Sequence, residues 1–574
     1  MKKVFLSLIS LLLVVILLAS CVNTQGGTTT STESEGGTTT TTSTTTTTTS
    51  TTTTTTTTSS SQNNDPEKDP TPDDPEKDPS DDQGGEEDLT YVEYVDGVKA
   101  EEPVQKGNYV VYVKPSDDSV WFAWDYDSWT IKNKDEKLTY EVYFFSVDAL
   151  FDSYQDLKEA TELSENQLVG TKSRTKGVGK GAAIYKTTTT KLSGSGTVSI
   201  NNMTLFGSLV PFDVNGEKIV TVEQFGAVGD SNTFDHTAIN NAIAYPSASV
   251  IEFESMSYLQ GETIWVSRDN VRINAKGAHI NNDYSKVTNR DFQAEGSASD
   301  RIENVTVENL VLYCTETTGK GVLYKNYDHF QFEMQYTKNL TVRNCKFIVP
   351  AYTNLESDLH ITSLSLRDGI NTLVEGNTIE NQCGSDSYSG GLWFWSDGDF
   401  ENVSSGIVVR NNYILKSSHD EVLAFFNGAF DDILVEDNTI ITRDEPIGDV
   451  SAHAIGFGVY NVPTTVSNVI FRNNKVDVVC EKDLMMFSAV KNIEIYNNTF
   501  IARNNSSSES IQYGVFRVTY DSSYEKKGIT VKPDRVMIYN NTVTVYNTKK
   551  VPLNHSSCGS GFTFYNNDFK CIIN

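Results

Sequence analysis

The chain carries a pair of adjacent carboxylates and, further along, a histidine in a similar apolar context. The first segment reads His419-Asp420-Glu421-Val422-Leu423-Ala424, and the second reads Ala452-His453-Ala454-Ile455-Gly456. Side chains of these types donate and accept protons in catalysis. The alternative interpretation is that the acids are solvated turn residues and that the histidine packs at a corner of the fold.

Aromatic and cationic residues stand on both sides of these segments. Trp393 and Trp395 alternate with Leu392 and Phe394. If this segment is a strand, one of the two pairs should face the protein core and the other should face away from it. If the tryptophans face outwards, they offer a surface on which a sugar ring can stack; if they face inwards, they are core residues. Arg517 adds a cation, and we group it with Trp393 and Trp395 as candidate ligand-binding residues.

The elements that must position these residues come from a repeat. One pattern recurs nine times in the C-terminal half: an apolar anchor, a corner residue two positions later, and a further apolar residue three positions beyond it. The anchors are Val307, Val342, Val374, Val409, Val435, Phe471, Ile495, Ile538 and Phe564. The corner residues are Asn309, Asn344, Gly376, Asn411, Asp437, Asn473, Asn497, Asn540 and Asn566.

The corner residues are of one chemical kind. Asn, Asp and Gly enter the left-handed backbone region at the lowest cost, so the pattern predicts a short strand, a tight corner and a second short strand in every copy. Asparagines stacked at one corner can also hydrogen-bond to one another along the stack. The corners are 24 to 43 residues apart, and the shorter intervals match one turn of a parallel solenoid.

This pattern resembles that of right-handed parallel β-helices. The segment VEQFGAVGDSNTFDHTAINNAI, residues 222–243, is similar to the opening motif of the pectate lyase superfamily, although Ser231 and Phe234-Asp235-His236 depart from it. We expect Asp235 to cap a helix that closes the end of the stack with an apolar stripe. That stripe is Ala238, Ile239, Ala242 and Ile243. The resemblance covers roughly residues 220–574 and implies the fold, not the reaction.

Each coil is expected to hold a further strand beyond the corner strands. The candidates are Leu364–Leu366, Leu392–Trp395, Val422–Phe426, Ile455–Val459, Leu484–Phe487 and Val515–Val518. Parallel strands lie about 4.8 Å apart, so matching positions in successive coils form a line on the surface. Such a line suits an extended polymer.

The acidic and histidine segments resemble the Asp-Asp and Gly-His-Gly motifs of polygalacturonase-type glycoside hydrolases. The resemblance implies that Asp420 and Glu421 are the acid and base carboxylates and that His453 supports them. Inverting hydrolysis of this kind needs two carboxylates roughly 6.5–9.5 Å apart.

Two further motifs of that family are missing. Ser389-Gly390-Gly391 offers no carboxylate one coil earlier, and Leu484-Met485-Met486 offers no cation one coil later. Arg517 lies a coil too late. A further carboxylate would therefore come from elsewhere, and the candidates are Asp386, Asp397 and Asp449.

The N-terminus is typical of an export signal. Lys2 and Lys3 precede an apolar run, Val4–Leu18, that is too short for a comfortable membrane span. The run ends in Leu18-Ala19-Ser20-Cys21, which resembles the lipobox of bacterial lipoproteins. This resemblance implies removal of residues 1–20 and lipidation of Cys21 on a secreted protein anchored at the bacterial cell surface. The alternative is ordinary secretory cleavage before an incidental cysteine.

Composition divides the rest of the chain. Residues 21–88 are Thr/Ser-rich and then Asp/Pro/Glu-rich, with almost nothing apolar to bury, so we expect a disordered stalk. Residues 89–215 are rich in aromatic and β-branched residues and predict a small β-sandwich-like domain with one short helix within Asp148–Glu162. In it, Trp121, Trp124 and Trp129 are either a sugar-stacking surface or, as we favour, packing residues. We expect residues 216–574 to form the right-handed parallel β-helix, so the predicted fold class is all-β.

Charge limits the partners. The formal net charge is -30, of which -10 lies between Ser61 and Thr90. The acidic balance argues against nucleic acid, whose phosphates are held by cationic surfaces, and against an anionic lipid surface. It also counts against a highly charged polyuronate unless metal ions or a local basic cleft offset the repulsion. The cysteines after Cys21 show no metal-ligand spacing, and we expect no metal site.

Two functions follow from these features. The first is cleavage of an extracellular polysaccharide, by a hydrolase rather than a lyase and without a cofactor. A lyase would need acidic Ca²⁺ ligands and an arginine or lysine base, for which Arg367 and Arg517 are available. The second is glycan binding or adhesion by the same fold without turnover. In both, the lipid anchor is the only contact with the membrane.

Overall fold

The structure is a computed structural model. It describes residues 91–282, 290–314, 328–350, 360–382, 389–396, 402–416, 421–442, 453–458, 465–479, 483–503, 514–519, 526, 532–546, 553–554 and 561–572. The predicted signal peptide, Cys21 and the predicted stalk lie outside these residues, and so does Asp420. Across the described part of the chain, no helix is long and apolar enough to cross a membrane.

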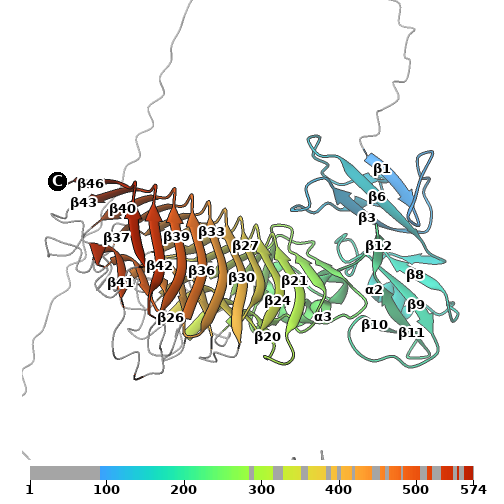
Figure 1. The fold of residues 1–574 in the computed structure, drawn as a ribbon. Helices are drawn as coiled ribbons and strands as arrows, with labels where there is room; N and C mark the ends of the chain where they lie inside the picture. Colours follow the sequence, from blue (N-terminus) through green and yellow to red (C-terminus); the bar gives the residue numbers. More distant parts are fainter. Residues whose placement is uncertain are drawn as a thin grey trace, which may run out of the picture. The chain divides into compact units, whose positions relative to one another are not determined.

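The C-terminal part of the chain coils through three long sheets that run side by side (Figure 1). The first sheet has 13 strands. They are β12 (Phe212–Val214), β13 (Glu217–Thr221), β15 (Val250–Glu252), β18 (Val271–Asn274), β21 (Ile302–Glu308), β24 (Thr337–Arg343), β27 (Ile370–Glu375), β30 (Val403–Arg410), β33 (Ala429–Glu436), β36 (Thr465–Arg472), β39 (Val490–Tyr496), β42 (Asp534–Tyr539) and β45 (Phe562–Tyr565). Apart from the antiparallel pair β12–β13, neighbouring strands are parallel.

The second sheet has 12 strands and follows the corner residues. They are β14 (Asp230–Phe234), β16 (Ser257–Gln260), β19 (His279–Asn282), β22 (Val311–Cys314), β25 (Lys346–Val349), β28 (Thr378–Asn381), β31 (Tyr413–Lys416), β34 (Thr439–Thr442), β37 (Lys475–Val479), β40 (Thr499–Arg503), β43 (Thr542–Tyr546) and β46 (Asp568–Ile572).

The third sheet has ten strands and contains every further strand that the sequence predicts. They are β17 (Ile264–Trp265), β20 (Arg290–Glu295), β23 (Asp328–Gln335), β26 (His360–Arg367), β29 (Ser389–Trp395), β32 (Leu423–Phe426), β35 (His453–Phe457), β38 (Asp483–Ser488), β41 (Gly514–Thr519) and β44 (Leu553–Asn554). Three parallel sheets wound in this order are a parallel β-helix, so the predicted all-β fold class is confirmed.

The predicted corner lies between the first and second sheets. All nine corner residues, from Asn309 to Asn566, adopt the left-handed conformation, with φ between 53° and 65°. The side chains of two of them donate to an asparagine one coil earlier: Asn309 to Asn274, the last residue of β18, at 3.0 Å, and Asn566 to the corner residue Asn540 at 3.1 Å.

A continuous ladder lies one residue beyond the corner, where the sequence analysis did not place it. Its members are Asn377, Asn412, Asn438, Asn474, Asn498, Asn541 and Asn567. At each step the backbone N–H and the side-chain Nδ2 donate to the Oδ1 of the next asparagine, as Asn438 does to Asn474 at 2.9 and 3.0 Å. The ladder satisfies buried polar groups where the backbone turns.

A helix closes the N-terminal end of the β-helix, as predicted (Figure 1). Helix α3 (His236–Ile243) follows the 3-10 helix η1 (Val222–Phe225), and all four residues of its predicted apolar stripe are buried. Asp235 stands at the N-cap, but its side chain makes no capping bond. It accepts instead from the backbone N–H groups of Val228 at 2.7 Å and Gly229 at 3.2 Å, and so fixes the preceding loop.

Three small sheets precede the β-helix. The first contains β2 (Val98–Lys99), β1 (Tyr91–Val95), β6 (Tyr140–Ser146) and β3 (Tyr109–Pro115). The second contains β10 (Thr197–Ile200), β11 (Leu205–Val210), β9 (Ala183–Thr188), β8 (Leu168–Thr171) and β7 (Ala149–Phe151), and the third pairs β4 (Trp124–Asp125) with β5 (Thr130–Ile131). The short helix expected here is α2 (Tyr154–Glu159).

Candidate functional site

The third sheet presents three rows of side chains away from the core. In β32, β35, β38 and β41, two adjacent residues, such as Val422 and Leu423, and the residue two positions after them belong to the buried apolar cluster. In β20, β23, β26 and β29, only the last two of these three positions, such as Leu392 and Phe394, belong to it. The residues before, between and after these core positions therefore point outwards. Strand pairing aligns them from coil to coil.

We name the rows by their order along the strand. Row A contains Arg290, Phe330, Thr362, Gly390, Glu421, His453, Asp483 and Gly514. Row B contains Gln293, Glu333, Ser365, Trp393, Ala424, Gly456, Met486 and Arg517. Row C contains Glu295, Gln335, Arg367, Trp395 and Phe426.

Row A brings two of the predicted residues together and adds one that the sequence analysis missed. Glu421, His453 and Asp483 occupy the same register position in three consecutive coils, since Leu423 pairs with Ile455 and His453 pairs with Asp483. The three segments share one pattern, Glu421-Val-Leu-Ala-Phe, His453-Ala-Ile-Gly-Phe and Asp483-Leu-Met-Met-Phe. Aligning these strands with one another would have identified Asp483.

The Glu421 side chain lies over a glycine of the next coil. A Cβ atom on Gly456 would be 3.5 Å from Cγ of Glu421, and Glu421 is only 4% exposed. Because Gly456 belongs to row B, this contact places the Glu421 side chain on the outward face of the sheet.

Asp483 lies beside the predicted arginine. Its Oδ2 is 3.6 Å from Nη1 of Arg517, which is one coil further on, and the Asp483 side chain is fully buried while that of Arg517 is 23% exposed. The backbone of His453 stands between the two carboxylates at the start of β35. Its side chain lies outside the described residues, as do Asp420 and the three carboxylates proposed as substitutes, Asp386, Asp397 and Asp449.

Both tryptophans face away from the core. Leu392 and Phe394 belong to the buried cluster, whereas Trp393 and Trp395, which alternate with them, are only partly buried. The Trp395 indole N–H donates to Oγ of Ser365 at 2.7 Å, and the Arg367 guanidinium lies 3.8 Å from its ring centroid. Phe426, which the sequence analysis also missed, stacks on Trp395 with ring centroids 6.1 Å apart.

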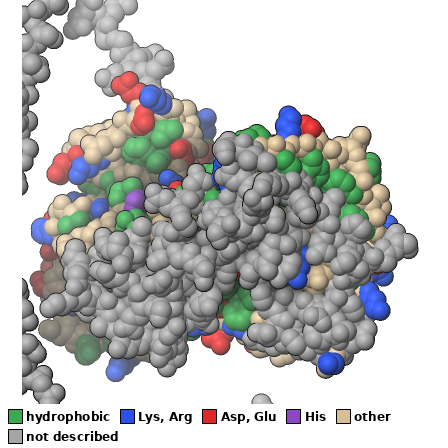
Figure 2. Space-filling model, turned by 90° about the vertical axis from the view of Figure 1, so that its left-hand side faces the viewer, with side chains coloured by type: hydrophobic (Ala, Val, Ile, Leu, Met, Phe, Trp, Pro, Cys, Tyr) green, Lys and Arg blue, Asp and Glu red, His purple; other side chains and the backbone are tan. Residues whose placement is uncertain are grey.

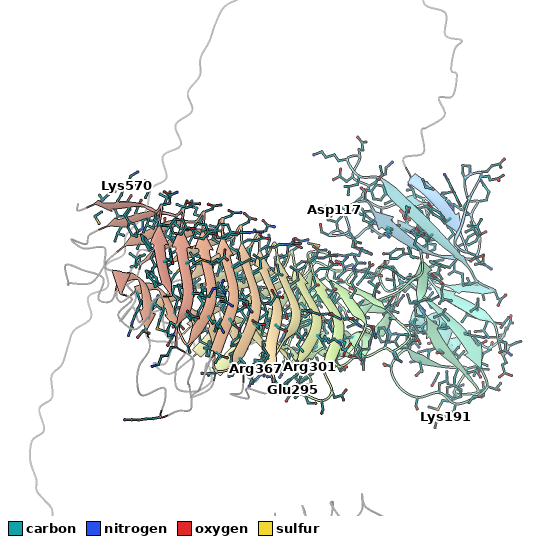
Figure 3. The ribbon with its side chains drawn as sticks, viewed as in Figure 1. Asp117, Lys191, Glu295, Arg301, Arg367 and Lys570 are labelled. Carbon is teal, nitrogen blue, oxygen red and sulfur yellow. The ribbon has the colours of Figure 1, made fainter. Side chains whose placement is uncertain are left out.

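Upstream of the tryptophans, a buried carboxylate joins two arginines. The Glu333 side chain is fully buried, contacts Nε of Arg290 and lies 3.5 Å from Nη1 of Arg367. Arg367, Arg301 and Glu295 lie together along one edge of the stack (Figure 3). These residues were not recognised as a group because they come from different coils.

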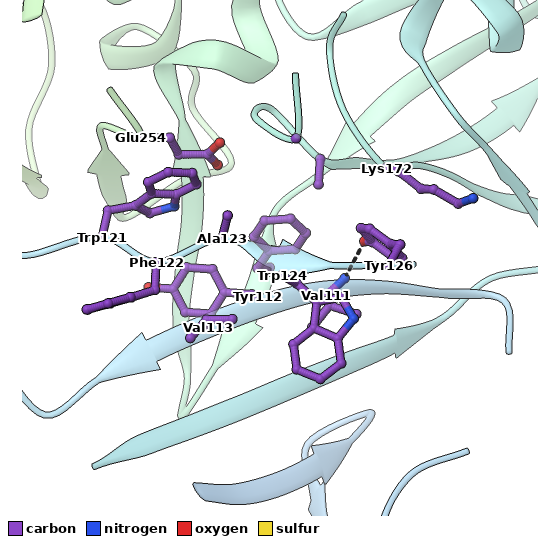
Figure 4. Close-up of a pocket in the computed structure, with 13 residues that line it drawn as sticks. Val111, Tyr112, Val113, Trp121, Phe122, Ala123, Trp124, Tyr126, Lys172 and Glu254 are labelled. Carbon is purple, nitrogen blue, oxygen red and sulfur yellow. Dashed lines mark hydrogen bonds between the residues drawn. The ribbon is translucent and has the colours of Figure 1, made fainter. Parts of the chain in front are cut away.

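A pocket lies between the small sheets and the β-helix (Figure 4). Its volume is about 360 Å³, open mouth included, and Trp121, Phe122 and Tyr126 line it together with Glu254. Of the other tryptophans named in the sequence analysis, Trp124 also lines the pocket but is buried in an apolar cluster, and the Trp129 indole N–H donates to the carbonyl of Val104 at 2.9 Å. These two pack within the small sheets.

The described side chains visible in Figure 2 include charges of both signs, with hydrophobic side chains between them. Among the residues whose positions are described, no group of three His, Cys, Asp or Glu side chains could hold a metal ion. Cys345 is a buried free thiol that contacts the carbonyl of Val307 at 3.6 Å.

No protein-family model and no curated protein matches the chain. Among solved structures, the chain is similar to the enzymatically active domain of tailspike protein 2 of bacteriophage CBA120, with a TM-score of 0.43 and 11% identity over 74% of this chain and 56% of that one. It is also similar to tailspike protein gp49 of Acinetobacter baumannii bacteriophage Fri1, a capsular polysaccharide depolymerase (TM-score 0.40, 11% identity, 74% and 75% covered).

A third similar structure is the Streptococcus pneumoniae surface protein and adhesin PfbA, with a TM-score of 0.36 and 15% identity over 62% of this chain and all of that one. This chain therefore spans little more than half the length of the first tailspike chain and the whole of the adhesin structure. At TM-scores below 0.5 these similarities carry no argument about function.

Proposed function

We propose that the protein hydrolyses an extracellular polysaccharide on the outward face of the third sheet, with Glu421 and Asp483 as its two carboxylates. The observation that carries the proposal is that both acids occupy row A two coils apart, with His453 between them. Neighbouring parallel strands lie about 4.8 Å apart, so the two backbones are separated by roughly 10 Å.

This separation supports an inverting mechanism. Glycosidases that invert place their two carboxyl groups roughly 6.5–9.5 Å apart, so that a water molecule fits between the sugar and the base. The Glu421 side chain lies over Gly456, in the coil of His453, which brings its carboxylate closer to Asp483 than the two backbones are. One carboxylic acid protonates the leaving oxygen, and the other carboxylate takes a proton from the attacking water.

The surrounding residues support a saccharide as the ligand. Trp393 and Trp395 stand on the same face, one coil before Glu421, and aromatic rings of this kind stack against apolar faces of sugars. Arg517, beside Asp483, is a donor for hydroxyl or carboxylate oxygens of the substrate. Small residues, Ala424 and Gly456, occupy row B in the coils of Glu421 and His453.

The test is release of reducing ends by the purified full chain from a panel of plant, host and capsular polysaccharides. Glu421→Gln and Asp483→Asn should each lower kcat by at least about a hundredfold, since each removes one proton-transfer group. Glu303→Gln, in the first sheet, is the matched control and should retain activity. Nuclear magnetic resonance of the first product should show inverted anomeric configuration; wild-type rates in either variant would refute the assignment.

Glycan binding without turnover is the second candidate function. The outward tryptophans favour it, because sugar stacking on Trp393 and Trp395 needs neither carboxylate. A chain that binds a polysaccharide of the panel with equal affinity in wild-type and Glu421→Gln forms, and releases no reducing ends, would be an adhesin.

We also propose that Cys21 carries a lipid and anchors the protein at the outside of a bacterial cell. The support is the lipobox-like segment Leu18–Cys21 after a short apolar run. Metabolic labelling with a radioactive fatty acid should mark the wild-type chain, whereas Cys21→Ala should be unlabelled and released into the medium.

A further inference from the structure

Trp393 does not stand upright on its strand but lies back over it. A Cβ atom built on Gly390 would be 2.3 Å from Cε2 and 2.7 Å from Cδ2 of the Trp393 indole. No side chain larger than hydrogen can therefore occupy position 390 while the ring keeps this place.

This arrangement moves the indole from row B into row A. Gly390 is the row A residue of the coil before Glu421, so the ring covers the place next to Glu421 in the row of the two carboxylates. The following residue is constrained as well, because a Cβ on Gly391 would be 2.4 Å from the carbonyl oxygen of Val422. Polygalacturonase-type glycoside hydrolases have an acidic motif at the place of Gly390-Gly391. Here the two glycines leave room for the Trp393 indole and for the Val422 carbonyl oxygen.

The indole is also bonded to the candidate catalytic coil. Its Nε1–H donates to the backbone carbonyl of Glu421 at 3.0 Å. On its other side the ring meets Phe426 edge-on, with centroids 5.4 Å apart and planes at 87°. Trp393 remains only partly buried, so part of the ring is accessible to a ligand.

We propose that Trp393, seated on Gly390, is both the stacking platform for the sugar next to the cleaved bond and the positioning residue for Glu421. This inference rests on the proposed function. A pyranose ring presents an apolar face that stacks on an indole, and a platform in row A orients that ring beside Glu421. The hydrogen bond to the Glu421 carbonyl then fixes the main chain from which the carboxylate extends.

The two roles separate in two variants. Trp393→Phe keeps an aromatic ring but removes the donor to Glu421, so kcat should fall about tenfold or more while KM changes less than about threefold, because small displacements of a reacting group are costly. Gly390→Ala forces the indole off its seat, so the affinity for oligosaccharide should fall about tenfold. Trp395→Phe, which removes a donor to Ser365 instead, should lower kcat less than Trp393→Phe does.

A binding measurement on the Glu421→Gln chain distinguishes failure of this inference from failure of the proposed hydrolysis. The indole ¹⁵N–¹H resonances are followed by nuclear magnetic resonance during titration with cello-, xylo- and galacturono-oligosaccharides. The Trp393 resonance is assigned by its loss in Trp393→Phe. A selective shift of the Trp393 resonance supports the platform, even if the wild-type chain cleaves none of the sugars. Cleavage or binding of a sugar without a shift of the Trp393 resonance overturns the inference. The inference is also overturned if no sugar of the panel is cleaved or bound.

Discussion

At the scale of single residues, two glutamates are buried where the small sheets meet the first coil of the β-helix. Oε1 of Glu223 accepts from Ser255 Oγ at 3.0 Å and also contacts the Tyr258 hydroxyl, while Oε2 of Glu254 accepts from the backbone N–H of Gly181 at 2.6 Å. Burial raises the pKa of Glu223 to about 7. Burial, together with the negative charge of Glu223, raises the pKa of Glu254 to about 8.

These raised pKa values predict a loss of stability at alkaline pH. Between the ordinary glutamate pKa of 4.5 and the raised values, the folded chain binds more protons than the unfolded chain, so the free energy of unfolding falls as the pH rises. Thermal unfolding of the wild type should therefore move to lower temperature from about pH 5 to about pH 9. Glu254→Gln, which stays neutral, should weaken this dependence.

The control for this prediction is Glu136→Gln, at an exposed position, which should leave the pH dependence unchanged. If Glu254→Gln and the wild type lose stability in parallel over the same range, the buried glutamates are not the titrating groups.

Part of the candidate site could be predicted from the sequence, residue by residue, and part could not. Glu421 and His453 were predicted because each resembles a local motif. Asp483 was not predicted, because the family pattern has a cation, not an acid, near Leu484-Met485-Met486. The direction of Trp393 could not be predicted, because alternation with Leu392 and Phe394 allows either pair to face the core.

At the scale of elements, the asparagine ladder should contribute more to stability than the left-handed corner beside it. Asn498 is buried; its Nδ2 donates to the carbonyls of Phe471 and Tyr496, and its Oδ1 accepts from Asn474. Asn498→Ala leaves several of these buried groups unpaired and should lower the free energy of unfolding by about 3 kcal/mol. The measurement is chemical denaturation at equilibrium.

The neighbouring residue provides a matched control. Asn497 is exposed and has a φ of 57°, a conformation that glycine adopts without strain. Asn497→Gly should change the free energy of unfolding by less than about 1 kcal/mol. Equal losses of unfolding free energy in the two variants would mean that the ladder contributes no more to stability than the corner residue does.

Most of the elements were predictable, since backbone preference at the corners repeats in every copy. The ladder itself was assigned one residue too early, because the left-handed preference of asparagine explains the first residue of pairs such as Asn497-Asn498 but not the second. A second series of left-handed asparagines within the first sheet, Asn304, Asn339 and Asn371, was also missed. The side chain of each donates to the asparagine one coil earlier at 2.7 to 3.0 Å. They were not predicted, because the sequence shows no turn at these positions.

At the scale of the whole molecule, the small sheets share a buried polar network and an apolar cluster with the β-helix. The Tyr112 hydroxyl lies 3.0 and 2.9 Å from the two carboxylate oxygens of Glu252, whose Oε1 is 3.2 Å from Nζ of Lys276. Tyr112 belongs to β3, whereas Glu252 ends β15. Val110 of β3 and Val250 of β15 pack in the same apolar cluster.

This network predicts that residues 91–574 of the wild type unfold as one cooperative unit. Tyr112→Phe leaves the buried Glu252 carboxylate without its hydroxyl donor, which should cost about 1–3 kcal/mol and separate an earlier transition of the small sheets from that of the β-helix. Differential scanning calorimetry of the full chain measures both transitions. Tyr109→Phe, in the same strand, is the control, and two transitions already present in the wild type would contradict the prediction.

The row arrangement has a consequence for how such a site can change. Glu421 and Asp483 are 62 positions apart in the sequence, yet in space they are only two coils apart. This separation is set by strand pairing alone. Insertions between the strands can therefore lengthen or shorten without altering the spacing of the two candidate acids. The sequence between the strands is free to diversify while Glu421 and Asp483 keep their places.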